Sequence, residues 1–330
     1  MKIDIFCHIV PRKYLEAARK AAPGDFPQLN LIEGTPTLTD LNVRFRIMDK
    51  YPEMVQVLTL ASPPVEKVVG SNMSVELAKI ANDEMTELVT KYPDRFVAAV
   101  GSLPMNNIDA ALKELERVMN GRMFRGIQIY TSIDGKSLDS SEFLPIYQMM
   151  SGFNLPIWLH PLREFDIPDY PGEKRSRYLM NSIFGWPYET SLAMGRLVFS
   201  GILEDHPNLK FITHHCGGMV PYFCDRITGQ YEYVSVYLGL KWKRPLKKHP
   251  IEYFRMFYND TAVYGSTAAL MCGYSFFGSE HLLFGTDMPY DSEIGNRYIR
   301  ETIRAIEEMD IPPSEKRGVF SDNAKQLLRL

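Results

Sequence analysis

The chain has 330 residues, of which 45% are hydrophobic and 23% are charged, and its formal net charge is −3. These values are ordinary for a globular protein, and a chain of this length can bury a large core. Because the sequence has no basic stripe, nucleic acid is not an expected partner. No run approaches the roughly 18 apolar residues of a membrane span, so a membrane is not expected either.

The cysteines and the amino terminus bear on where the protein works. The thiols show no C-x-x-C spacing, and the first apolar stretch is too short for a signal peptide. We therefore expect reduced thiols and a cytoplasmic protein. The cysteines are Cys7, Cys216, Cys224 and Cys272.

Eight short β-type runs recur along the chain and are separated by longer segments. Helix-period patterns fill the segments between them, most clearly over residues 75–92 and 109–121, and the second pattern ends at a glycine stop. In chain order the runs are KIDIFCH from Lys2, MVQVLTLA from Met54, FVAAVGSL from Phe96, GIQIY from Gly126, LPIWLH from Leu155, LKFITHH from Leu209, MFYNDTAVY from Met256 and LLFGTD from Leu282.

This alternation of strand and helix favours the α/β class and a parallel sheet closed into a (β/α)8 TIM barrel, with one domain over residues 1–330. A doubly wound open sheet is the rival fold, but no G-x-G-x-x-G follows an early strand. Two stretches are too long for simple connections, from about residue 10 to 40 after the first strand and from about 161 to 190 after the fifth. We interpret both as inserted lid segments.

Polar residues close several of these runs: His8 the first, His160 the fifth, His214 and His215 the sixth, and Asp287 the eighth. In a barrel the carboxyl ends of the strands ring one mouth, so residues far apart in sequence meet in one pocket. A single histidine at a strand end is more often a capping or packing residue. Recurrence at four strand ends predicts a metal or polar catalytic cluster, because imidazole and carboxylate together suit zinc, manganese or iron.

The neighbouring histidines of the sixth run need to be separated. Alternation along a strand points only one of His214 and His215 into the barrel. Gly217 and Gly218 follow directly and indicate a tight turn at the mouth. We therefore select His215 as the site residue and expect His214 to pack against a helix.

Motifs along nearly the whole chain resemble those of the amidohydrolase superfamily, in the branch of aminocarboxymuconate-semialdehyde decarboxylase and γ-resorcylate decarboxylase. The stretch over residues 185–218 is the most specific of them. The motifs are DIFCHIVP, RIMDKYPEMVQVLTLA, GIQIY, LPIWLHP, GWPYETSLAMGRLVFSGILEDHPNLKFITHHCGG, YNDTAVYG, LLFGTDMPYD and SDNAKQLL.

The resemblance implies a role for each strand-end residue. His8 and His160 would be metal ligands, and Asp287 would be a ligand or immediate neighbour of the metal as well as a proton carrier. His215 would be a general acid/base that does not hold the metal tightly. The implied cofactor is one divalent metal ion, with zinc as the first choice and manganese as the alternative.

The resemblance also implies residues that contact substrate. Trp186 lies in the WPYE segment, which lines the pocket in the phenolic-acid decarboxylases. Arg226 stands eleven residues after His215, where an arginine of such decarboxylases reaches a substrate carboxylate across a subunit interface. The expected partners are therefore a small carboxylic acid and further copies of the chain, in a homo-oligomer that is a dimer or a tetramer.

Phe6 departs from this pattern, because the family has histidine or glutamate there and a phenyl ring cannot bind a metal. The period-two rule places Phe6 beside His8 on the face that lines the mouth, among the substrate-binding positions. Cys7 is a soft ligand, but the same rule turns it to the opposite face. Three outcomes stay open: a metal held more weakly by His8, His160 and Asp287, catalysis without a metal, or a dead or altered site.

The leading hypothesis is a metal-dependent carboxy-lyase, a decarboxylase of a small aromatic or unsaturated carboxylic acid. A metal-dependent hydrolase or hydratase is the alternative, because the same residues could activate water. A third possibility is a barrel that has lost its metal and binds a ligand or partner, for which Phe6 is the only support.

Overall fold

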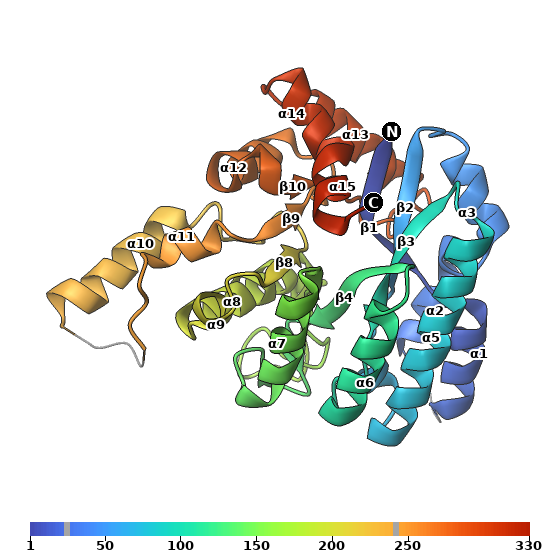
Figure 1. Ribbon diagram of the computed structural model, residues 1–330, viewed down its shortest axis with the longest axis horizontal. Helices are drawn as coiled ribbons and strands as arrows, with labels where there is room; N and C mark the ends of the chain where they lie inside the picture. The colour runs from blue at the N-terminus through green and yellow to red at the C-terminus, as the bar shows by residue number, and fades with distance from the viewer. Residues whose placement is uncertain (23–26, 240–243) are drawn as a thin grey trace.

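The computed structural model describes residues 1–22, 27–239 and 244–330, and its eight parallel strands close into the expected barrel (Figure 1). Each strand overlaps one of the eight runs, which confirms the fold class. Spatial order follows chain order around the sheet. The strands are β1 (Lys2–Ile9), β2 (Met54–Leu60), β3 (Phe96–Ser102), β4 (Phe124–Tyr130), β7 (Pro156–His160), β8 (Lys210–Thr213), β9 (Tyr258–Asp260) and β10 (Leu282–Leu283), with a separate hairpin of β5 (Ser132–Ile133) and β6 (Lys136–Ser137).

The barrel closes between β1 and the segment that follows β10. The backbone N–H of Ile5 donates to the carbonyl of Phe284 over 2.9 Å, and that of Asp287 donates to the carbonyl of Phe6 over 3.0 Å. Because all eight strands run in the same direction, their carboxyl ends meet at one rim, where barrel enzymes carry their active sites.

Helices surround the barrel (Figure 1). The two clearest helix-period patterns form α5 (Ser71–Lys91) and α6 (Ile108–Met119), as expected; the Asn107 side chain caps α6 by accepting from the N–H of Ala110. None of the helices in the described ranges is long and apolar enough to cross a membrane. The others are α1 (Arg12–Ala21), α2 (Pro27–Gly34), α3 (Leu41–Met48), α4 (Val65–Val68), α7 (Leu144–Phe153), α8 (Trp186–Phe199), α9 (Ile202–Asp205), α10 (Cys224–Glu232), α11 (Pro250–Phe254), α12 (Thr267–Phe277), α13 (Asn296–Glu307), α14 (Pro313–Arg317) and α15 (Asn323–Leu328).

Apolar side chains fill the interior of the barrel below the rim. Ile3, Val57, Trp158 and Ile212 come from four different strands and pack in one buried cluster. Leu327 of α15 belongs to the same cluster, so this last helix closes the end of the barrel opposite the rim. The interior below the rim is therefore a packed core.

Strand β1 contains an irregularity, and the side chains beside it point to opposite faces of the strand. The pairing of β1 with β2 shifts register between Asp4 and Cys7, as a β-bulge does. Phe6 lies in the inner cluster, whereas Cys7 packs in the outer cluster and its thiol donates to the carbonyl of Val57 over 3.3 Å. This confirms that Cys7 faces away from the mouth, so its thiol does not replace a missing ligand.

The two long stretches differ from each other. Residues 10–40 contain α1, α2 and a 3-10 turn at Pro36–Leu38, and residues 23–26 of this stretch lie outside the described residues. Residues 161–179 form turns and bends, and a π-helical turn at Asn181–Gly185 then leads into α8. Both stretches follow strand ends at the rim, and their function as lids stays a prediction.

Candidate metal centre and active site

Four of the strand-end residues that the sequence singled out converge at the rim, as expected. Nε2 of His8 lies 3.2 Å from Oδ1 of Asp287, and Nε2 of His215 lies 3.6 Å from Oδ2 of the same carboxylate. The ring of His160 has its centroid 5.2 Å from that of His8. All four side chains are buried or nearly so.

The expectation for His214 is wrong. Its fully buried ring does not pack against a helix but lies in the centre of the cluster, stacked on Phe6 with centroids 3.9 Å apart and planes at 10°. Its Nε2 lies 3.2 Å from Oδ1 of Asp287. One ligand nitrogen each from His8, His160 and His214 lie within 4.8 Å of one another.

Alternation fails at this point because the strand has already ended. β8 stops at Thr213, and the chain then enters the left-handed region, with φ of 55° at His215 and 53° at Cys216. This turn brings both neighbouring imidazoles to the rim, and their centroids are 3.9 Å apart. Such φ values cost a non-glycine residue about 1–2 kcal/mol, and backbone strain of this kind is concentrated at functional sites.

Gly217 continues the left-handed turn at φ 77°, where a Cβ would come within 2.7 Å of the Phe277 ring. The expected tight turn is thus confirmed. Asp287 also has a positive φ, of 60°, and its loop is fixed to the barrel by the preceding residue. Thr286 donates to the buried carboxylate of Asp4 through Oγ1 over 2.6 Å and through its backbone N–H over 3.1 Å.

Each of the three clustered imidazoles is held through its Nδ1. Nδ1 of His8 lies 3.2 Å from Oγ1 of Thr59, and Nδ1 of His160 lies 2.7 Å from the carbonyl of Pro161. Nδ1 of His214 contacts the carboxylate of Asp260. Outer partners of this kind fix the tautomer of a ligating histidine and turn its Nε2 toward the metal.

The donor set fits a divalent metal ion. Nε2 of His8 and Nε2 of His214 are buried without a hydrogen-bond partner among the described residues, although each lies 3.2 Å from Oδ1 of Asp287. These two nitrogens are therefore available as ligands of an ion beside that oxygen. In a tetrahedral site with ligands 2.0–2.1 Å from the metal, neighbouring ligand atoms are about 3.4 Å apart.

The electrostatics of the cluster agree with this fit. Burial lowers the pKa of His8 and holds that of His160 well below its usual value, so both are neutral and can ligate. Burial opposes the charged form of His214, but the carboxylates of Asp260 and Asp287 outweigh it and raise its pKa to about 10. Burial alone would raise the pKa of Asp287, yet the surrounding histidines, chiefly His214, hold it well below its usual range. The cluster therefore favours positive charge at its centre.

Aromatic side chains wall this centre. Trp186, at the start of α8, has its ring 5.9 Å from that of His160 and 6.3 Å from that of His215, and its indole N–H is buried without a partner among the described residues. Tyr130 and Tyr290 lie against His160 and His8, with centroids 4.9 and 5.4 Å apart. Trp186 thus lies beside the cluster, and its indole N–H is available to donate a hydrogen bond.

Sequence reasoning missed Asp260, Tyr264 and the two wall tyrosines. The hydroxyl of Tyr264 lies 3.2 Å from Nε2 of His215 and 3.4 Å from Oδ2 of Asp287. Tyr130 and Asp260 end β4 and β9, so the strand-end rule applied to every polar residue would have found them. Tyr264 stands on a loop at φ 54°, and no periodicity could indicate it.

Phe6 forms the floor of the cluster. It is fully buried, and His214 covers one face of its ring while His8 and His160 lie 5.5 and 6.0 Å away. The expectation that Phe6 points into the mouth beside His8 is confirmed. Its contact with substrate stays a prediction.

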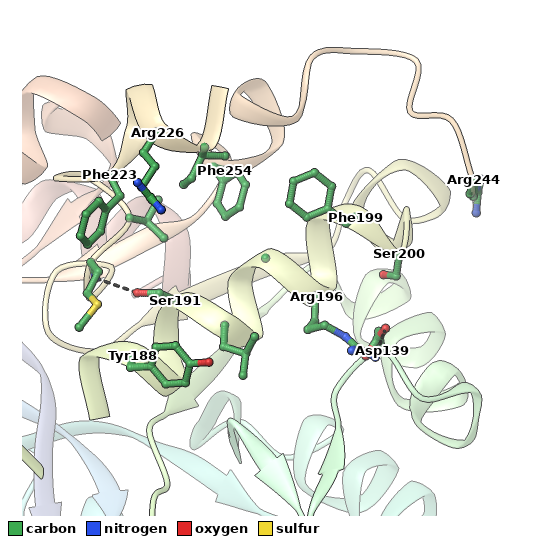
Figure 2. A pocket seen from close by; sticks show the side chains of 15 residues that line it. Asp139, Tyr188, Ser191, Arg196, Phe199, Ser200, Phe223, Arg226, Arg244 and Phe254 are labelled. Atoms are coloured by element: carbon green, nitrogen blue, oxygen red, sulfur yellow. Dashed lines mark hydrogen bonds and ion pairs between the residues drawn. The ribbon is translucent and has the colours of Figure 1, made fainter. Parts of the chain in front are cut away.

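Arg226 lies outside the cluster of its own chain. It is exposed on α10 and lines a groove of about 1080 Å³ between α8 and α10 (Figure 2). None of the strand-end histidines described above lines this groove. The expected reach of Arg226 into a neighbouring subunit stays a prediction. The apolar walls of the groove are Tyr188, Leu192, Phe199, Met219, Val220, Phe223, Ile227 and Phe254.

A family model described as Amidohydrolase matches residues 3–330. The chain belongs to the amidohydrolase family. This confirms the resemblance that the motifs carried, and the match spans the whole barrel, including all five strand-end residues.

Relatives within the family are decarboxylases. The chain is 27% identical over 301 residues to γ-resorcylate decarboxylase of Rhizobium sp. (strain MTP-10005), which covers 88% of each protein. It matches the structure of 5-carboxyvanillate decarboxylase from Sphingomonas paucimobilis with a TM-score of 0.83 and 25% identity, over 100% of this chain and 99% of the other. It also matches a dihydroxybenzoic acid decarboxylase from Polaromonas sp. JS666, solved with bound manganese and 2-nitroresorcinol, with a TM-score of 0.78 and 25% identity over 100% and 97% of the two chains.

Proposed function

We propose that this chain is a metal-dependent carboxy-lyase that removes carbon dioxide from a small aromatic carboxylic acid. The enzyme is a decarboxylase of the amidohydrolase superfamily, as its relatives are. The observation that carries the proposal is the cluster of imidazoles and one carboxylate, with unpaired Nε2 atoms, beneath an aromatic wall.

A divalent ion would be held by His8, His160 and Asp287, the residues that the resemblance assigns and the rim brings together. When bound, it would act as a Lewis acid toward the carboxylate and a neighbouring oxygen of the substrate. Imidazole and carboxylate ligands support zinc, and the manganese in a related decarboxylase supports the alternative.

The aromatic wall favours a flat substrate. Trp186 and Tyr130 flank the ring of His160, and ring contacts of this kind add about 0.5–1.5 kcal/mol beyond the area buried. The buried indole N–H of Trp186 has no partner among the described residues, and it can donate to an oxygen of the substrate. An aromatic acid with an oxygen substituent would satisfy both the wall and this donor.

Decarboxylation needs a proton at the carbon that loses its carboxyl group. The bond to the carboxyl carbon breaks, carbon dioxide leaves, and the electron pair left on the ring carbon takes the proton. We assign delivery to Asp287, whose Oδ2 lies 3.4 Å from the hydroxyl of Tyr264 and 3.6 Å from Nε2 of His215. Its lowered pKa makes it a carboxylate in the resting site, so it first accepts a proton that comes from water through these neighbours and then donates it to the ring carbon.

We infer that the active form is a dimer or a larger homo-oligomer. The groove between α8 and α10 is mostly apolar, and α10 extends away from the barrel (Figure 1). Tyr222 and Tyr237, at either end of this extension, are 78% and 79% exposed. Exposed apolar surface of this extent is typical of interaction sites, and a second copy seated there would bring Arg226 toward a neighbouring rim.

A cytoplasmic location is part of the same proposal. All four cysteines are free thiols, and Cys7 and Cys216 are buried. Unpaired thiols are typical of a reducing compartment.

Product analysis tests the proposed reaction. The protein loaded with zinc or manganese should release carbon dioxide from γ-resorcylate, 5-carboxyvanillate or another hydroxylated benzoate. In heavy water, deuterium should appear on the carbon that lost the carboxyl group. A ring-opened or hydrated product without carbon dioxide would instead establish the hydrolase or hydratase alternative.

A further inference from the structure

We propose that His214 is a metal ligand of this chain and that it replaces the ligand missing at Phe6. The inference rests on the proposed metal dependence and deepens it, because it assigns the third imidazole of the centre. No motif assigned this residue to the site. The geometry of the rim carries the argument.

The first step is the position of Nε2. This atom of His214 and the corresponding atom of His8 lie at equal distances, 3.2 Å, from the same oxygen of Asp287. The ligand nitrogens of His8, His160 and His214 lie within 4.8 Å of one another. Both Nε2 atoms are buried without a hydrogen-bond partner among the described residues, so both lone pairs are available to an ion that lies beside Asp287.

The second step is the support behind the ring. Asp260 is fully buried, contacts Nδ1 of His214, and accepts through Oδ1 from the backbone N–H groups of Cys216 and Ala262 over 3.1 and 3.0 Å. These hydrogen bonds fix the carboxylate, which in turn fixes the imidazole. A carboxylate behind a histidine is the arrangement that orients metal-bound imidazoles and increases their basicity.

The third step explains why a phenylalanine suits position 6. The phenyl ring lies parallel to the imidazole of His214, with 3.9 Å between centroids, and fills the space beneath it. A ligating imidazole at position 6 would have to project past the ring of His214 to reach the metal. Phe6 therefore acts as a positioning residue: it supports the histidine that takes over the ligand's task.

The rival interpretation is that a proton alone sits between His214 and Asp287, as a buried ion pair that Asp260 extends. Both interpretations place positive charge at the same point. They differ in whether loss of His214 affects the metal.

The test measures metal binding rather than turnover. Zinc and manganese dissociation constants are determined by competition with a chromogenic chelator for the wild type, His214→Ala, His215→Ala and the double variant Phe6→His/His214→Ala. His214→Ala should weaken binding by more than the roughly 10–100-fold that loss of an outer partner costs. His215→Ala should weaken binding by no more than the same roughly 10–100-fold, because Nε2 of His215 lies 3.6 Å from Oδ2 of Asp287, the position of an outer partner of this ligand. The double variant should recover most of the lost affinity.

X-ray absorption of the zinc-loaded wild type counts imidazole ligands without any substitution, so misfolding of a variant cannot obscure the result. Three imidazoles would support the assignment, and two would overturn it. Unchanged metal affinity in folded His214→Ala would also overturn it and leave the ion pair as its role. Carbon dioxide release, measured in parallel, tests the proposed function separately: a wild type that binds metal through three imidazoles but releases none would contradict the reaction and not the ligand.

Discussion

The rim of the barrel and the groove between α8 and α10 are built in opposite ways. At the rim, fully buried His8 and His214 are each held from behind, by Thr59 and Asp260. In the groove, Arg226 is exposed and the walls are mostly apolar side chains. The rim is thus a buried polar cluster, whereas the groove has the apolar composition that is typical of an interaction surface.

This difference suits the two regions to two tasks, metal binding at the rim and substrate selection at the groove. Holding a metal requires nitrogens placed within a few tenths of an ångström, which only a packed and hydrogen-bonded interior provides. Selecting a substrate tolerates more freedom and can be shared between subunits. Trp186 lies at the boundary, because its ring faces His160 while the next turn of α8, at Tyr188 and Leu192, lines the groove.

The largest expected effect is the loss of the metal from the rim. His160→Ala should abolish metal retention after dialysis and reduce kcat/KM by more than the roughly 10–100-fold typical of outer-partner substitutions. Cys7→Ala is the control: it removes a buried side chain of β1 that packs in the outer cluster, and it should retain the metal. Elemental analysis of both dialysed proteins checks the result, and metal loss in the cysteine variant would contradict the assignment of faces.

The strand-end rule accounts for how much of this rim the sequence could predict. It located His8, His160 and Asp287 correctly, because each follows a strand whose direction the barrel fixes. The alternation rule, which we used to choose between His214 and His215, failed for His214. Alternation applies only while the chain remains extended, and β8 ends one residue before His214. The strand-end rule would have found Asp260, which ends β9, had aspartate in that run been weighed like histidine.

What the sequence could not predict depends on turns and on assembly. Tyr264 reaches His215 only because its loop adopts a positive φ, which no periodicity indicates. The fold class and all eight strands followed from hydrophobic runs, since burial on both faces of a barrel strand leaves a clear signal. Helices α1 and α2 within the first long stretch were not expected, because proline, glycine and asparagine there indicated a loop.

The next effect separates proton transfer from metal binding within the rim. His215→Ala should lower kcat by about 10²–10⁴, the usual contribution of a general acid or base, while leaving metal content unchanged. The reason is that its Nε2 lies near Oδ2 of Asp287 and the hydroxyl of Tyr264, whereas Nε2 of His8 and of His214 lie near Oδ1. Steady-state kinetics with elemental analysis checks this, and an equal loss of metal and activity would count against a separate role.

A smaller effect belongs to the groove. Arg226→Ala should raise KM by about 10–100-fold, as expected for loss of a hydrogen bond to a charged group worth about 1.5–3 kcal/mol, with little change in kcat. Arg122→Ala is the control, because Arg122 is also exposed but lies near the start of β4, at the opposite end of the barrel. Unchanged kinetics in the Arg226 variant would leave the groove without a role in substrate binding.

Mixing subunits sharpens the same prediction. In a dimer of one His215→Ala chain and one Arg226→Ala chain, one site combines an intact His215 with the partner's intact Arg226. Random pairing of equal amounts should therefore regain about a quarter of the wild-type sites, since half of the symmetric dimers are mixed. No gain on mixing would mean that Arg226 serves its own chain or none.

The last prediction concerns stability rather than activity, at a carboxyl near the rim whose pKa is raised while that of Asp287 is lowered. Glu66 of α4 is buried, and burial, with a smaller contribution from Asp134, raises its pKa from 4.5 to about 8. Lys67 only partly opposes this shift, because its ammonium pairs with Glu164 at 3.2 Å. The folded protein therefore keeps Glu66 protonated where the unfolded chain has released the proton.

The sign of the pH dependence follows from that difference. The stability that Glu66 contributes is fully present below about pH 4.5 and is lost as the pH rises toward about 8, by at most about 1.4 kcal/mol per pH unit. Glu66→Gln keeps the shape of the neutral acid and cannot ionise, so its free energy of unfolding should match the wild type at pH 5 and exceed it at pH 8.5. Urea unfolding at both pH values measures this, with exposed Glu76→Gln on α5 as the control. If wild type and Glu66→Gln lose stability equally between the two pH values, the carboxyl is solvated or paired, and the contrast between a cation-held Asp287 and an unpaired Glu66 does not hold.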